Sequence, residues 1–128
     1  RSGVLADPKL AGSRSSLRQN LENLKILFDA GVRIGFGTDS GATPLRVGGI
    51  AEHRELRLMV EAGLSPLQAL TVATSGAAAA LGLEDRGRIA PGLRADFLLF
   101  DADPSEDIAN SQTLRVTWIL GRGYPRPH

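Results

Sequence analysis

One carboxylate, that of Asp39, lies where an apolar stretch of this 128-residue chain gives way to small polar residues. Before it, Val32, Ile34 and Phe36 recur with the period of two that is typical of a β-strand. The apolar stretch then stops at the polar run 38–41. In parallel α/β folds the carboxyl ends of the strands carry the chemistry, because loops and backbone dipoles converge there. The pattern therefore predicts a buried strand that delivers Asp39 to a catalytic or binding site.

Two other interpretations of the same segment fail, and a third stays open. A dinucleotide-binding fingerprint needs a glycine three residues after Gly37, and that position is Ser40. A nucleophile elbow needs a glycine two residues before Ser40, and that position is Thr38. Aspartate is also a common residue for capping a turn. The segment alone therefore leaves a catalytic and a turn-capping role for Asp39 open.

Three longer motifs follow one another along the chain. They are G-T-D at 37–39, E-L-x-x-M-V-E-A-G-L-S-P-x-x-A-L at 55–70 and G-x-I-x-P-G-x-x-A-D-F at 87–97. The ordered set resembles the C-terminal part of the metal-dependent amidohydrolase superfamily, above all its prolidase-like and imidazolonepropionase-like members. The resemblance runs from about Leu17 to Gly123 and implies an α/β fold class. We expect the C-terminal part of a (β/α)8 barrel plus strands of the small flanking β-sandwich.

The resemblance also implies a chemistry for Asp39. This residue matches the aspartate at the end of the eighth barrel strand, which ligates a divalent metal and accepts the proton of the attacking water. A metal lowers the pKa of its bound water towards roughly 7, and a neighbouring carboxylate can accept the proton. The implied parent enzyme hydrolyses a C–N bond of a small-molecule amide or peptide-like substrate, with zinc as the expected metal.

The other metal ligands of that family do not lie in the matching region. Its H-x-H pair, two later histidines and a bridging lysine all come earlier in the chain, whereas the histidines here are His53 and His128. A zinc site needs three or four protein ligands. We therefore expect an incomplete metal site and no hydrolase activity from this chain alone.

Two further residues are candidates for substrate binding. His53 lies in the loop-to-helix segment that follows Asp39, where loops often carry function. Arg46 could bind a substrate carboxylate through a bidentate pair of hydrogen bonds. The alternatives are a structural role for His53 and a solvated loop position for Arg46. A Ser-His-Asp triad of Ser40, His53 and Asp39 has no support from the spacing.

Composition indicates a globular protein without special partners. The chain is 42% hydrophobic and 23% charged with a net charge of +1. It has no basic run for nucleic acid and no apolar run long enough for a membrane helix. The absence of cysteine excludes disulfides and thiolate metal sites. The expected location is the cytoplasm.

The remaining patterns predict the elements that position these residues. A helix over 16–30 begins with a Ser16–Gln19 capping box and ends at Gly31. A second helix is expected over 51–62. A third helix begins at Ser65 and Pro66, is kinked at Ser75–Gly76 and ends at Gly82. Strands are then expected at 88–89, 96–101 and 113–121. A tight turn at Pro91–Gly92, a polar loop over 103–112 and a frayed end over 124–128 complete the prediction.

Length bears on the organisation of the chain. A (β/α)8 barrel takes about 250 residues, so we expect barrel elements in 1–83 and sandwich strands in 84–128. The chain begins with Arg1, which suggests an excised, processed or truncated product. Two alternatives to an enzyme fragment remain: an inert assembly module, and one half of a split enzyme completed by another chain. Uncovered apolar faces favour homo-oligomers, or association with a missing N-terminal portion.

Overall fold

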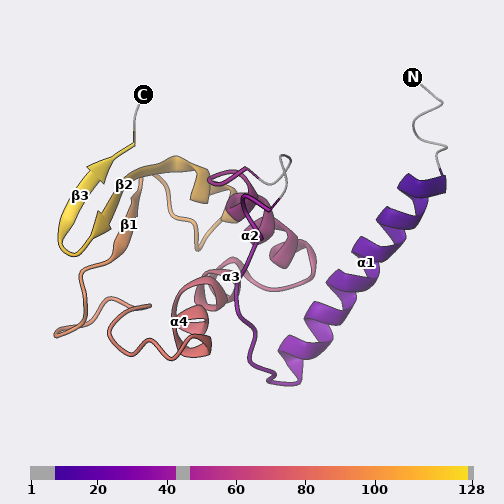
Figure 1. Cartoon of the computed structure of the whole chain (residues 1–128), viewed down its shortest axis with the longest axis horizontal. Coiled ribbons are helices and arrows are strands. Elements are labelled where there is room, and N and C mark those ends of the chain that lie inside the picture. Colours follow the sequence, from indigo (N-terminus) through magenta and orange to yellow (C-terminus); the bar gives the residue numbers. More distant parts are fainter. Residues whose placement is uncertain (1–7, 43–46, 127–128) are drawn as a thin grey trace.

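The computed structural model describes residues 8–42 and 47–126 (Figure 1). The helices are α1 (Pro8–Asp29), α2 (Ala51–Glu61), α3 (Pro66–Thr71), a π-helical turn (Val72–Gly76) and α4 (Ala77–Ala80). The strands β1 (Phe97–Phe100), β2 (Leu114–Ile119) and β3 (Arg122–Pro125) form an antiparallel sheet in that order, and a 3₁₀-helix (Ile108–Thr113) precedes β2. Figure 1 shows the sheet and α1 at opposite ends, with the other helices between them. Among the described residues, none of the helices has the length and apolar composition that a bilayer crossing requires.

Helix α1 begins earlier than its sequence pattern predicted. It starts at Pro8, and the predicted capping box of Ser16 and Gln19 is wrong. The Ser16 hydroxyl donates instead to the backbone carbonyl of Gly12 at 3.0 Å, the bond that serine makes inside a helix. The predicted end at Gly31 is confirmed, since Gly31 has φ 72 and so supplies the left-handed residue that terminates many helices.

The second and third helices follow the prediction closely. Helix α2 covers 51–61 against a predicted 51–62. At the start of α3 the Ser65 hydroxyl accepts from the Gln68 amide at 3.2 Å, and the Gln68 side chain accepts from the Ser65 amide at 2.7 Å. The predicted irregularity at Ser75–Gly76 is present as the π-helical turn. The local signals of caps and small residues therefore located these elements.

The core lies where α2, α3 and the 3₁₀-helix meet. Its buried members are Leu56, Met59, Leu64, Ala69, Val72 and Ile108. Ile34 and Phe36 pack against this cluster from the segment that precedes Asp39, as do Leu24 and Phe28 from α1. The core therefore holds Ile34 and Phe36 in place, whereas Asp39 is exposed and lies outside the core.

The strand predicted at 32–37 is not formed, and this prediction is wrong. Residues 32–38 carry no ladder, because the three strands of the described chain pair only with one another. The alternation of the pattern persists: Ile34 and Phe36 are half-buried, and the glycines between and after them are exposed. A Cβ on Gly76 would lie 3.7 Å from the Ile34 carbonyl oxygen, so the helical region packs closely on this segment.

The C-terminal half combines confirmed and corrected predictions. Strands β1 and β2 lie within the predicted 96–101 and 113–121, and Phe97 stacks on Trp118 with ring centroids 5.2 Å apart. The strand predicted at 88–89 is absent, although Gly92 makes the predicted turn with φ 83. The predicted polar loop over 103–112 ends in the 3₁₀-helix, which buries Ile108 and Ser111.

Strand β3 is the main element that the sequence did not predict. Residues 122–125 pair with β2, whereas a frayed end was predicted from residue 124. The turn between these strands is Leu120–Gly121, with φ 53 and 75. Both values are positive, as a type I′ hairpin turn requires. The Leu120 amide donates to the Asp96 carboxylate at 2.8 Å, and this bond supports a turn in which leucine is unusual.

Candidate functional site

Asp39 has an unusual backbone conformation. Its φ is 49, and among the described residues other than glycine only Leu120 also has a positive φ. Side chains disfavour this left-handed region, which aspartate tolerates better than most residues. The Ala42 amide donates to the Asp39 carbonyl at 3.0 Å and closes a turn behind it. Such strain often accompanies functional sites, so the conformation supports a functional hypothesis for Asp39.

A carboxylate from α2 holds the residues on both sides of Asp39. The hydroxyls of Thr38 and Ser40 lie 2.7 Å apart, and each donates to Oε1 of Glu52, at 3.1 and 2.5 Å. The other carboxylate oxygen, Oε2, accepts from the Gly49 amide at 2.6 Å. The loop that contains Asp39 is thereby joined to the first turn of α2.

These hydrogen bonds keep Glu52 charged. They lower its pKa from the ordinary 4.5 to about 2, the Ser40 hydroxyl having the largest effect, followed by backbone amides that include Gly49. Partial burial acts in the opposite direction and is outweighed. Sequence reasoning did not single out Glu52. An acidic residue in a first helical turn was a weak signal, but its hydroxyl partners lie 12 and 14 residues away along the chain.

His53 faces another part of the molecule. Its Nδ1 lies 3.0 Å from the hydroxyl of Ser111, which is only 2% exposed, so the pair joins α2 to the 3₁₀-helix. The Ser40 hydroxyl donates to Glu52 instead, and these contacts do not assemble the triad of Ser40, His53 and Asp39.

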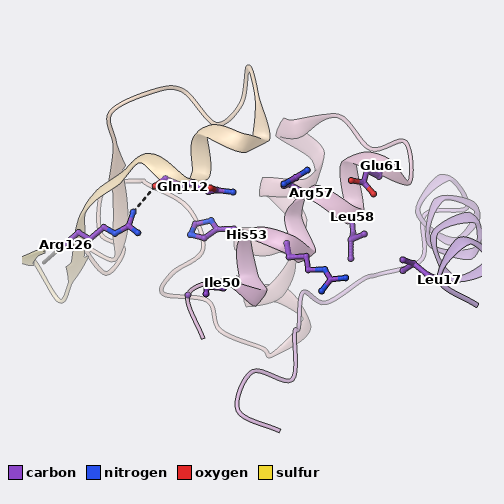
Figure 2. A pocket seen from close by; sticks show the side chains of 10 residues that line it. Leu17, Ile50, His53, Arg57, Leu58, Glu61, Gln112 and Arg126 are labelled. Atoms are coloured by element: carbon purple, nitrogen blue, oxygen red, sulfur yellow. Dashed lines mark hydrogen bonds between the residues drawn. The ribbon is translucent and has the colours of Figure 1, made fainter. Parts of the chain in front are cut away.

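His53 also lines an open pocket of about 590 Å³ (Figure 2). Figure 2 shows it beside Gln112, whose carbonyl accepts from Arg126 at 2.9 Å. Arg54 and Arg57 line the same pocket, and Asp39 does not. The structure therefore does not bring His53 and Asp39 together in this pocket. Arg46, the other predicted substrate-binding residue, and His128 lie outside the described residues.

The described residues do not form a metal site by themselves. Within 8–42 and 47–126, no group of three or more histidine, aspartate, glutamate or cysteine side chains is placed to hold a metal ion. Zinc sites take three or four protein ligands, and Asp39 alone would provide one. The donor set of this segment therefore does not fit the complete metal group that the family resemblance implies.

Comparison with known proteins identifies the family. Residues 2–122 match the amidohydrolase family, and the chain belongs to it. The chain is 39% identical over 100 residues to an imidazolonepropionase of Deinococcus deserti, covering 74% of this chain and 24% of that protein. It is 47% identical over 79 residues to adenine deaminase 2 of Desulfotalea psychrophila, covering 62% of this chain and 12% of that protein.

The fold agrees with this assignment. A Xaa-Pro dipeptidase crystallised with methionine in its active site matches with a TM-score of 0.74 and 31% identity, over 83% of this chain and 25% of that one. The chain thus spans about a quarter or less of the length of these relatives. Its architecture is α/β, the C-terminal part of the amidohydrolase barrel with strands of the flanking sandwich. Members of the superfamily generally use divalent metals.

Proposed function

We propose that this chain contributes the Asp39 carboxylate to an enzyme that hydrolyses a C–N bond. One observation carries the proposal: Asp39 lies in a strained backbone conformation at the end of the core-packed segment of Ile34 and Phe36 in a member of the amidohydrolase family. The alternative is a turn-capping role for Asp39, whose backbone carbonyl accepts a hydrogen bond from the Ala42 amide.

The proposed role of Asp39 is that of a general base. As water attacks the substrate carbon, the carboxylate accepts the proton that the water loses, and the leaving amine or ammonia takes a proton to depart. Zinc is the proposed metal of the complete site, with its remaining ligands outside the described residues. Because these residues do not fit a metal site alone, only the proton transfer is assigned to this chain.

The proposed substrate is a small-molecule amide or peptide-like compound. The relatives are named for action on imidazolonepropionate, adenine and Xaa-Pro dipeptides, and removal of the adenine amino group and cleavage of a dipeptide both break a C–N bond. We place the barrel elements in 1–83 and the sandwich strands in 84–128. His53 and Arg46 remain proposed substrate contacts, although the Ser111 bond of His53 also supports a structural role.

A chimeric enzyme tests the proposal. This chain replaces the matching segment of the Deinococcus deserti imidazolonepropionase, and hydrolysis of that enzyme's substrate is measured. Asp39→Asn removes the charge and the proton acceptor but keeps the shape, so kcat should fall about 10²- to 10⁴-fold. The matched control is Asp29→Asn, because Asp29 is exposed on α1 and pairs with Lys25. The control should retain turnover, since exposed ion pairs contribute little.

The outcomes separate the competing functions. Near-normal turnover by Asp39→Asn contradicts the role of Asp39 as base. A chimera that folds cooperatively yet has no turnover favours the inert assembly module. Restored activity when this chain is co-expressed with a separate polypeptide carrying the rest of the enzyme favours the split-enzyme alternative.

A further inference from the structure

The carboxylate of Glu52 makes its contacts on both sides of Asp39. Its Oε1 accepts hydrogen bonds from Thr38, the residue before Asp39, and from Ser40, the residue after it. Two side chains that share one acceptor oxygen fix the backbone between them. We therefore infer that Glu52 is a positioning residue, which holds the Asp39 backbone in its left-handed conformation and so orients the Asp39 carboxylate. The inference rests on the proposed function, because orientation matters only if Asp39 acts on substrate.

The strength of these contacts supports the inference. Hydrogen bonds to an ionised carboxylate are roughly twice as strong as those between neutral groups. The Ser40 hydroxyl donates to the Glu52 carboxylate, and the Ser40 amide also donates to the Thr38 hydroxyl at 3.3 Å. The hydrogen bonds thus link three polar residues around Asp39 into one unit, and Glu52 is its only member from α2.

A simpler role for Glu52 is to start helix α2. The bond from the Gly49 amide to Oε2 serves that role, since Gly49 lies three residues before Glu52 and just ahead of the helix. The bonds to Thr38 and Ser40 reach 14 and 12 residues back along the chain, which helix initiation does not require. The two roles therefore use different oxygens of the same carboxylate and can be separated by mutation.

Hydrogen exchange of the full chain tests the first step of the inference. Glu52→Gln keeps the size of the side chain but removes its charge and one acceptor oxygen. Exchange of the amides in 38–42 should become about tenfold faster. The matched control is Glu61→Gln, at the exposed opposite end of α2, which should leave the exchange of 38–42 unchanged. Equal exchange of 38–42 in the unmodified chain and Glu52→Gln overturns the inference.

Kinetics of the chimera test the second step. Glu52→Gln should lower kcat at least tenfold with KM within twofold, because a small displacement of a catalytic group lowers the rate strongly. The double variant Thr38→Val, Ser40→Ala leaves the Gly49 bond in place and should give the same loss. Combining it with Glu52→Gln should add little further loss, the sign of a shared unit. The double variant also serves if Glu52→Gln does not fold.

The outcomes distinguish this inference from the proposed function. If Asp39→Asn abolishes turnover while Glu52→Gln and the double variant keep the original kcat, the inference is wrong and the proposed function stands. If Asp39→Asn keeps its turnover, both are wrong. A loss in Glu52→Gln that the double variant does not reproduce assigns Glu52 to the helix start alone and also overturns the inference.

Discussion

Gly87 is the glycine, among those that the structure describes, at which an added methyl group would meet the closest neighbour. A Cβ there would lie 2.6 Å from the Cβ of Ala78 and 3.1 Å from the Cα of Ser75. These atoms belong to short, rigid groups that cannot rotate away. Gly87 also has φ 91, which side chains rarely adopt. Left-handed strain costs about 1–2 kcal/mol, and overpacking adds about 1–3 kcal/mol. Gly87→Ala should therefore lower the free energy of unfolding by about 2–5 kcal/mol.

The matched control is Gly92→Ala. Gly92 has a similar φ of 83, but nothing lies within 4 Å of an added Cβ. The control therefore measures the backbone strain alone, about 1–2 kcal/mol. Urea denaturation followed by circular dichroism, at equal protein concentration for all variants, gives the comparison.

The difference between the two variants isolates the contacts of the added Cβ with Ser75 of the π-helical turn and Ala78 of α4. Gly87→Ala should unfold at clearly lower urea than Gly92→Ala, by roughly 1 M for a typical dependence on denaturant. Equal midpoints would show that the segment around Gly87 does not pack on Ala78 and Ser75 as the structure has it. Unchanged stability in both variants would also refute the assigned backbone conformations.

Two further predictions concern pH and association. The pKa of Glu52 is about 2 in the folded chain against an ordinary 4.5, so its stabilisation is complete above pH 4.5 and is lost as the pH falls towards 2. The stability difference between the unmodified chain and Glu52→Gln should shrink over that interval in urea titrations; a difference independent of pH contradicts the assignment. The isolated chain should also form homo-oligomers, because Ile26 and Val32 are 64% and 48% exposed. Sedimentation equilibrium at low micromolar concentration measures this, and a well-folded monomer would contradict it.

The parts of the fold that the sequence predicted are those with local signals. The Ser65 cap and the helix end at Gly31 depend on residues within one turn of the chain. The alternation of Ile34 and Phe36 predicted the buried side of the Asp39 segment, but a strand needs neighbours to pair with, and the described residues supply none.

The parts of the fold that could not be predicted from the sequence depend on contacts between residues far apart along the chain. Strand β3 follows a turn at Leu120, whose sequence does not suggest a hairpin and whose support comes from Asp96, 24 residues earlier. The contacts of Glu52 with Thr38 and Ser40, on either side of Asp39, were likewise not predictable from the sequence, since they join residues 14 and 12 positions apart.

Adjacent residues of α2 connect two distant parts of the chain. Side chains that follow one another on a helix project about 100° apart. Glu52 accordingly bonds to the Asp39 loop, and His53 bonds to the buried Ser111 of the 3₁₀-helix. A recombinant with its crossover between residues 53 and 111 would take His53 from one parent and Ser111 from the other. Exchanges of the C-terminal portion among relatives should therefore succeed more often when the crossover keeps a compatible pair at positions 53 and 111.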